Sequence, residues 1–168
     1  MKKYFRVVRE DFKRNNSFLS KMVISIFRLG NVYKDKKGFY CFFHLIHAFL
    51  DLFIIKLLIG SDIPKQIECG EGLRIPHGGR GIIIHPTVKI GKNVTIFHQV
   101  TIGVKEPIIQ GATIENNVYI GAGAKIIGSV LIGENCRIGA NAVVVKDVPP
   151  NSTVVGIPGK IIKRAEEK

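Results

Sequence analysis

The chain of 168 residues is strongly basic, with 25 Lys and Arg against 13 Asp and Glu and a formal net charge of +12. This length fits one domain, or one domain with an appended helical piece. Neither a basic stretch interleaved with aromatic residues nor a known nucleic-acid motif is visible, which argues against a nucleic-acid partner. The three cysteines show no paired spacing, so no disulfide framework is expected and the reducing cytoplasm is the predicted location.

The first predicted element is a helix over residues 4–30, where apolar residues recur at helical spacing with basic residues between them. The first 38 residues hold 11 basic and 3 acidic residues. Met1 to Arg14 lacks the apolar centre and cleavage site of a signal peptide. A solvated basic surface is the simplest interpretation, and peripheral contact with the anionic inner face of a membrane is the sharper one.

The second predicted element covers residues 39–59, a long and very apolar stretch that nevertheless contains His44, His47, Asp51 and Lys56. A membrane span needs about 20 mostly apolar residues, and ionisable side chains are costly inside a bilayer. The two histidines and Asp51 recur at helical spacing and form one polar stripe. We therefore expect a buried amphipathic helix packed on the coil or on a partner subunit; a helix lying on the membrane surface ranks second and a true span third.

A period of six organises the chain between residues 84 and 148. The position four further along is small or apolar in every repeat but one, where Glu106 stands. A period of six belongs neither to a helix nor to a strand, and suits a chain that turns a corner every six residues. Stacked coils bury such a column continuously, so the pattern predicts a parallel β-helix of hexapeptide repeats. The branched aliphatic residues of the column are Ile84, Ile90, Ile96, Ile102, Ile108, Ile114, Ile120, Ile126, Ile132, Ile138 and Val144.

These patterns predict a mainly β protein in three parts. Residues 1–60 form an α-helical N-terminal region, residues 61–162 the β-helix, and residues 163–168 a charged tail. Residues 103–111 either continue the repeat, since Ile108 keeps register, or form a protruding loop, which Pro107 favours.

The repeats end in the phrase Val155-Gly156-Ile157-Pro158-Gly159-Lys160 and resemble the hexapeptide-repeat acyltransferases, whose fold is a left-handed β-helix. Residues 60–162 resemble the serine O-acetyltransferases and, more closely still, the short relatives that acetylate polysaccharide sugars, such as the colanic-acid acetyltransferases. The resemblance implies an enzyme that moves acetyl from acetyl-CoA to a hydroxyl group and works as a homotrimer. A non-catalytic trimerising scaffold is the alternative of another class, since fold alone does not establish an activity. The segments that carry the narrower resemblance are Asp62-Ile63, Leu73-Arg74-Ile75-Pro76-His77, Gly81-Ile82-Ile83 and Val94 to Gly103.

The resemblance assigns catalysis to His77 and Asp62, which keep the 15-residue spacing of the serine enzymes. His77 is expected to take the proton of the attacking hydroxyl group, and Asp62 to fix the ring of His77 and stabilise its charged form. Fifteen residues is near one coil, so the two side chains are expected to meet on adjacent turns. His98 is expected to contact the acceptor, whereas His85 is interpreted as having no catalytic role.

The same resemblance places CoA along small residues at the turns of the coil. Gly103, Ala122 and Ala140 are the matching positions, and Lys160 is expected to meet the CoA phosphates. The alternative for each is ordinary repeat packing or a solvated tail. No cluster of cysteines or carboxylates accompanies the histidines at metal-ligand spacing, so no metal site is predicted.

The acceptor is where the chain departs from the serine enzymes. They carry an Arg-His-Pro that reads the serine carboxylate, and the matching positions here are Gln110-Gly111-Ala112. A missing guanidinium removes a two-pronged hold on a carboxylate. The chain also ends in Glu166-Glu167-Lys168, without the tail that docks the sulfhydrylase partner of those enzymes. A sugar unit of a surface polysaccharide is therefore the favoured acceptor, with L-serine for cysteine synthesis as the alternative.

Overall fold

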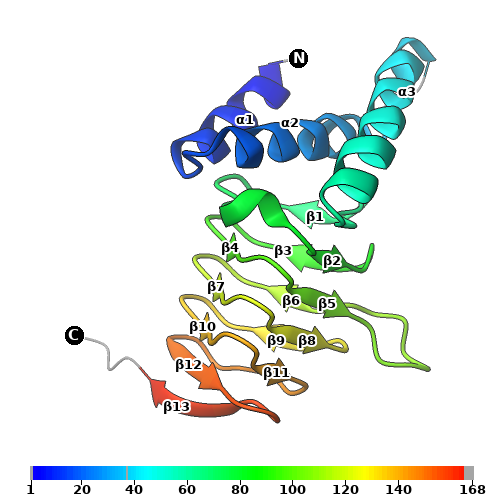
Figure 1. The fold of residues 1–168 in the computed structure, drawn as a ribbon. Coiled ribbons are helices and arrows are strands. Elements are labelled where there is room, and N and C mark those ends of the chain that lie inside the picture. The colour runs from blue at the N-terminus through cyan, green and yellow to red at the C-terminus, as the bar shows by residue number, and fades with distance from the viewer. Residues whose placement is uncertain (1, 37, 165–168) are drawn as a thin grey trace.

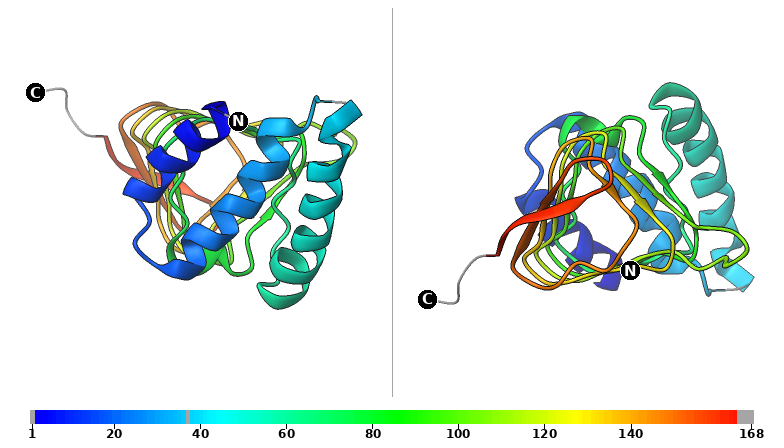
Figure 2. Two further views of the ribbon diagram at one scale, coloured as in Figure 1. Left: turned by 90° about the horizontal axis from the view of Figure 1, so that it is seen from above. Right: turned by 90° about the horizontal axis from the view of Figure 1, so that it is seen from below.

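A computed structural model describes residues 2–36 and 38–164 (Figure 1). Helices occupy one end of the molecule and a coil of short strands forms the rest. Seen along the coil axis, the helices lie side by side across the end of the coil (Figure 2). The helical segments are α1 (Lys2–Lys13), α2 (Phe18–Tyr33), the short η1 (Gly38–Tyr40), α3 (Cys41–Leu50) and its π-helical continuation η2 (Asp51–Leu58).

The coil is a triangular prism with one sheet on each side (Figure 2). The sheets have the strand orders β1-β3-β6-β9, β2-β5-β8-β11 and β4-β7-β10-β12-β13. Neighbours in these sheets are parallel except for β12 and β13, which pair antiparallel at the far end. The predicted left-handed β-helix with a short helical N-terminal region is confirmed. The strands are β1 (Glu68–Cys69), β2 (Ile83–Ile84), β3 (Lys89–Ile90), β4 (Thr95–Ile96), β5 (Thr101–Gly103), β6 (Thr113–Ile114), β7 (Tyr119–Ile120), β8 (Lys125–Ile127), β9 (Leu131–Ile132), β10 (Arg137–Ile138), β11 (Val143–Val144), β12 (Ser152–Val155) and β13 (Lys160–Arg164).

The sixfold column lies inside the prism. Ile120 pairs with Ile96 on one side and with Ile138 on the other, and the 18-residue step from 120 to 138 is one complete coil. Every residue of the column except Ile108 is at most 4% exposed. Burying one such side chain stabilises a fold by about 1.5–3 kcal/mol, so the column supplies the core that a single repeat lacks.

Residues 104–110 leave the coil as a loop. Ile108 keeps the sequence register but is 61% exposed, and Ile109 beside it is 65% exposed. A bridge between Lys105 and Ile108 closes the loop on itself. The predicted protruding loop is confirmed, and it lengthens this coil so that Ile102 pairs with Ile126.

The N-terminal helices differ from the sequence-based expectation in two ways. The single helix predicted over residues 4–30 is two helices, because the chain breaks after Lys13 and Ser17 caps α2 by accepting a hydrogen bond from the Ser20 N–H. The helix predicted over residues 39–59 exists, but within this chain only His47, Ile55 and Ile59 of its described residues are buried. It packs on α2 along one side and leaves the other side uncovered. The expected burial of this helix against the coil is therefore wrong within one chain, and its burial against a partner subunit stays a prediction.

A buried ion pair clamps α1 and α2 to the first coil. Asp11 and Arg28 are 0% and 1% exposed, and Arg28 Nε lies 2.7 Å from Asp11 Oδ2. The guanidinium also donates to the carbonyls of Cys69 and Gly70, while Asp11 Oδ1 accepts the backbone N–H of Leu73 at 2.9 Å. Charges this deep need full pairing, and both partners have it. The ion pair, here called the clamp, therefore holds α1 and α2 in position on the first coil.

Candidate active site

His77 lies in a short turn, η3 (Pro76–Gly79), on the first coils. Its backbone adopts the left-handed conformation, with φ 59° and ψ 23°, and Gly78 and Gly79 follow in the same region. A residue with a side chain pays about 1–2 kcal/mol for this conformation, so the surroundings must hold the turn.

Helix α2 supplies that hold. Ser20 Oγ donates to the carbonyl of Ile75 at 2.8 Å and accepts the N–H of Gly78 at 3.2 Å. Leu19 lies so close to Gly78 that an added Cβ there would come within 2.5 Å of it. The Oδ1 atom of Asn15 accepts the N–H of Ile75 at 3.0 Å. The start of α2 thus fixes the backbone that presents His77 to solvent.

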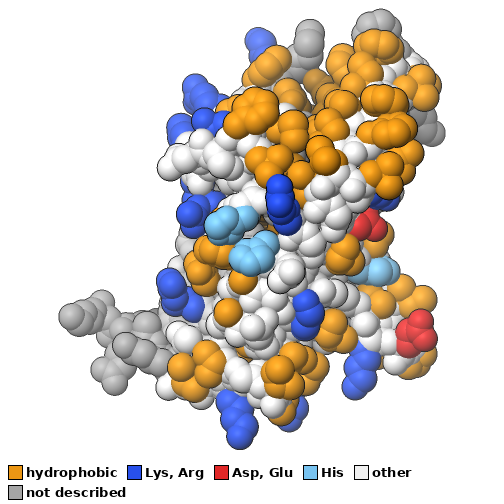
Figure 3. Space-filling model, in the orientation of Figure 1, with side chains coloured by type: hydrophobic (Ala, Val, Ile, Leu, Met, Phe, Trp, Pro, Cys, Tyr) orange, Lys and Arg blue, Asp and Glu red, His pale blue; other side chains and the backbone are white. Residues whose placement is uncertain are grey.

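The ring of His77 faces His98 across the coil surface. The two ring centroids are 5.2 Å apart with the planes nearly perpendicular, and Phe97 lies 6.3 Å from His77. The Nδ1 atom of His98 is buried and has no hydrogen-bond partner among the described residues. Figure 3 shows two neighbouring histidines on one open face of the molecule. The structure thus brings together the predicted base, His77, and the predicted acceptor contact, His98.

A cavity of about 350 Å³ opens over the two histidines. Arg80 and Gln99 line it with Ile59, Gly60 and Gly81. Arg80 is exposed, and its guanidinium makes no hydrogen bond or ion pair with the described residues. Arg80 was not among the residues predicted from the sequence, since a lone cation in a Gly-rich turn follows no repeat that would single it out.

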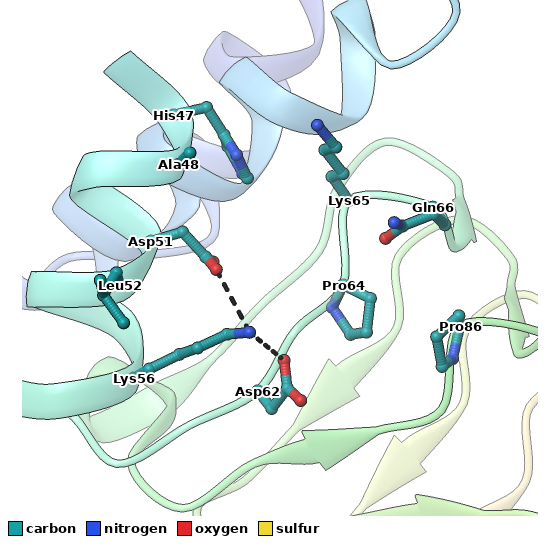
Figure 4. Close-up of a pocket in the computed structure, with 10 residues that line it drawn as sticks. All are labelled: His47, Ala48, Asp51, Leu52, Lys56, Asp62, Pro64, Lys65, Gln66 and Pro86. Atoms are coloured by element: carbon teal, nitrogen blue, oxygen red, sulfur yellow. Dashed lines mark ion pairs between the residues drawn. The ribbon is translucent and has the colours of Figure 1, made fainter. Parts of the chain in front are cut away.

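Asp62 lies elsewhere. Its backbone pairs with the first coils, through a bridge to Ile83, and its carboxylate lies 3.5 Å from Lys56 Nζ, which also reaches Asp51 at 3.7 Å. Figure 4 shows this chain of charges lining a separate cavity of about 410 Å³ under the helix. No hydrogen bond joins Asp62 to His77 in the described part of the chain.

The reason is the length of the first coil. Asp62 stacks on Ile83 and Arg74 stacks on Thr95, so these coils take 21 residues, whereas a regular later coil, such as that from Ile120 to Ile138, takes 18. A residue 15 positions before His77 therefore does not lie beneath it. The expectation that the 15-residue spacing equals about one coil is wrong, and the pairing of Asp62 with His77 stays a prediction.

One corner of the prism runs from the histidine cavity along the coil. His98, Ala122 and Ala140 hold equivalent places there, since Gly123 donates to the His98 carbonyl at 3.0 Å and Asn141 to the Ala122 carbonyl at 2.9 Å. Ala122 is half-buried and Ala140 is exposed. Two of the residues predicted to meet CoA thus share one edge with His98.

The other predicted CoA positions lie apart from this edge. Gly103 ends β5 beside Ile127, whose Cδ1 atom would lie 3.5 Å from a Cβ at that position, an ordinary contact distance. Lys160 starts β13 and is exposed at a cavity of about 430 Å³ lined by residues of β11 and β12. Lys163, which the tail offers as a second basic residue for the CoA phosphates, has its side chain outside the described residues.

The histidine cavity includes neither His85 nor a group of metal ligands among the described residues. His85 Nδ1 lies 2.9 Å from Thr87 Oγ1 on a coil corner, away from the residues that line the histidine cavity. Among the described residues, no group of three or more His, Cys, Asp and Glu side chains is placed to hold a metal ion. The chemistry available at the cavity is therefore that of two imidazoles and one guanidinium.

A left-handed coil of hexapeptide repeats with a histidine cavity on its surface defines the class of hexapeptide-repeat transferases. Residues 111–146 match the family model described as bacterial transferase hexapeptide (six repeats). A serine acetyltransferase of Mycobacterium tuberculosis is 43% identical over 123 residues, which cover 66% of this chain and 49% of that protein. One of Bacillus pumilus is 40% identical over 117 residues, which cover 68% of this chain and 54% of that protein.

The solved structures agree. A serine acetyltransferase of Neisseria gonorrhoeae, in complex with serine, aligns with a TM-score of 0.76 and 30% identity over 95% of this chain and 69% of that one. The chain belongs to the hexapeptide-repeat acyltransferases of the serine acetyltransferase type. It spans about half the length of the curated relatives that it matches. These relatives are serine acetyltransferases, so they do not carry the narrower resemblance to the polysaccharide enzymes.

Proposed function

We propose that the protein is an acetyl-CoA-dependent O-acetyltransferase in which His77 is the general base. The observation that carries this proposal is the turn at His77. Its strained left-handed backbone is held by Ser20 and Asn15, and its ring stands free over a cavity beside His98. Asn93, Gln99 and other residues of the coil share this backbone conformation, so the support comes from the held position of the His77 ring over the cavity.

The chemistry follows from that placement. A hydroxyl group is a weak nucleophile, and an imidazole that takes its proton during attack on the thioester carbonyl accelerates the reaction by about 10²–10⁴-fold. The sulfur of CoA then leaves with the electron pair of the broken C–S bond, and the proton passes from the imidazolium to the thiolate. The ring centroid of His98 lies 5.2 Å from that of His77, and we assign His98 to contact with the acceptor.

The edge formed by His98, Ala122 and Ala140 is the proposed path of the pantetheine arm. The small side chains of Ala122 and Ala140 leave room for the arm beside the backbone, and the edge starts at the histidine cavity. Gly103 and Lys160 are assigned to the same cofactor, with Lys160 on its phosphates. The edge lies at the surface of a single chain. We propose that it lies at the boundary between two subunits of a homotrimer, and that the enzyme works in the cytoplasm.

L-serine is the acceptor that the relatives favour, and Arg80 supplies a cation that can hold its carboxylate. A guanidinium suits this task because it binds a carboxylate through two parallel hydrogen bonds. A sugar hydroxyl is the second candidate. It is favoured by Gln110 and Gly111, which offer no cation where the serine enzymes carry Arg-His-Pro.

The test is the release of free thiol from acetyl-CoA, measured with L-serine and with nucleotide-linked sugars. His77→Ala is expected to lose about 10²–10⁴-fold in kcat while its melting temperature stays near that of the wild type. His85→Ala is the matched control, since the His85 side chain bonds only to Thr87 among the described residues. A His77→Ala protein that keeps full activity sinks the assignment, and wild-type silence with every acceptor favours the trimerising scaffold.

Asp62 needs a separate experiment. If it orients His77 in the assembled enzyme, Asp62→Asn shifts the pH profile of kcat/KM and lowers kcat. If it serves only the ion pair with Lys56, then Asp62→Asn and Lys56→Met lower the melting temperature to a similar, small extent and leave the pH profile unchanged.

A further inference from the structure

A stripe of large apolar side chains runs along the outer side of α3 and η2. Its members are single residues or adjacent pairs that recur three or four residues further along the helix, so they share one broad helix face. Their exposed fractions run from 48% to 72%. Figure 3 shows apolar side chains gathered over the helical end of the molecule. The stripe consists of Phe42, Leu45, Phe49, Leu52, Phe53, Leu57 and Leu58.

This face is not used by the core of the chain. The opposite side of the same helix packs on α2 through His47 and Ile55, which are 5% and 0% exposed. Residues 41–58 are long and apolar enough to be a candidate membrane span, but they are anchored to α2 along that side. A helix held in this way can present one face to a bilayer surface without crossing it. A contiguous exposed patch of seven large apolar side chains is typical of an interaction site.

The charge around the stripe indicates which surface it meets. On α1, the side chains of Lys2, Arg6 and Arg9 surround Phe5, which is 64% exposed, and together they line a shallow hollow. Helix α1 belongs to the same helical end of the molecule as α3, with α2 between them (Figure 2). Basic residues beside exposed aromatic and aliphatic ones match anionic lipid headgroups above an acyl layer.

We infer that α1 and the stripe on α3 and η2 form one surface that binds an anionic lipid bilayer peripherally. The apolar side chains enter the headgroup and acyl boundary, and the cations of α1 pair with lipid phosphates. The surface ends beside the candidate active site, because Ile59 and Gly60 follow η2 directly and line the His77 cavity. This inference does not depend on the acyl transfer chemistry.

The test is flotation of the purified full chain with vesicles of phosphatidylcholine alone and of phosphatidylcholine mixed with phosphatidylglycerol. We expect binding to the mixed vesicles that weakens as salt is raised. Leu45→Ser with Phe49→Ser should lower the partition constant at least about tenfold, because two large apolar side chains no longer leave water. Arg6→Glu should lower it about fivefold at low salt.

Matched controls are available on the loop of residues 104–110. Ile108→Ser with Ile109→Ser removes two equally exposed apolar side chains, and Lys105→Glu reverses one exposed charge there. Both controls are expected to bind vesicles as the wild type does, and circular dichroism checks that all variants fold. Wild-type protein that fails to float with mixed vesicles overturns the inference. So does a stripe variant that still binds while its oligomer falls apart in sedimentation, since the stripe would then face a second copy of the chain.

Discussion

Removing the carboxylate of Asp11 should unfold this protein far more easily than removing any surface charge. In Asp11→Ala, Arg28 stays buried with no anion beside it, and the Leu73 N–H loses its acceptor. Breaking one partner of a buried pair costs about 3–5 kcal/mol. The two carbonyls that Arg28 also reaches, those of Cys69 and Gly70, soften this loss but carry no full charge.

For a chain of this size, each kcal/mol shifts the melting temperature by about 2–4 °C, so the expected drop is roughly 6–20 °C. The assay is thermal unfolding followed by circular dichroism at one protein concentration, because an oligomer's melting temperature depends on concentration. Glu10→Ala is the control, since Glu10 directly precedes Asp11 in α1 and its ion-pair partner, Lys13, is exposed to solvent. That variant should melt close to the wild type.

A double variant separates the charge from the packing. Asp11→Leu combined with Arg28→Met replaces both ions by apolar groups of similar length, and well-packed replacements of buried pairs are often neutral. The double variant should therefore recover most of the stability lost in Asp11→Ala. If Asp11→Ala melts within about 2 °C of the wild type, the clamp does not join the helices to the coil as described.

Three other changes have defined outcomes. Arg80→Ala should raise KM for L-serine about tenfold or more with little change in kcat, because a charge-assisted hydrogen bond to the carboxylate is lost; an unchanged KM in steady-state assays contradicts the role of Arg80. Ile126→Ala, in the buried column, should lower the free energy of unfolding by about 2–5 kcal/mol in urea titrations, whereas Ile109→Ala on the loop should leave it unchanged. Burial lowers the pKa of His47, with Asp51 partly opposing the effect, so the unfolded chain takes up a proton below about pH 6.5 before the folded protein does. Stability should therefore fall as the pH decreases from that value, and His47→Gln should lose this slope.

The column of branched residues made the coil readable from the sequence. A period of six leaves one geometric solution, and each inward position from Ile84 to Val144 other than Ile108 is buried as that solution requires. Ile108 shows the limit of the pattern: it keeps the period, yet Pro107 and its neighbours leave the coil. Periodicity records spacing along the chain, whereas burial depends on whether the next coil is there to receive the side chain.

The site was predictable only in part, for a related reason. His77 and His98 lie on neighbouring coils, and stacking brings their rings together. Asp62 precedes the regular repeats, where the coils are longer, so counting along the sequence misplaces it. Arg80 was missed because a lone cation in a Gly-rich turn carries no period, and only its place in the cavity gives it meaning. The break between α1 and α2 was missed because apolar residues on both sides continue one helical pattern through it.

The 18-residue step between equivalent positions such as Ile120 and Ile138 allows this architecture to change its length by whole turns. Ile120 and Ile138 hold the same place on successive turns, so deletion of residues 121–138 would rejoin equivalent corners and leave each remaining coil with a matching neighbour. His77, the clamp formed by Asp11 and Arg28, and the helices lie at the other end of the coil and would not change. The deletion removes Ala122, and Ala140 takes its place on the edge beside His98, so a chain of this kind can gain or lose a whole 18-residue turn while its histidine end stays as it is.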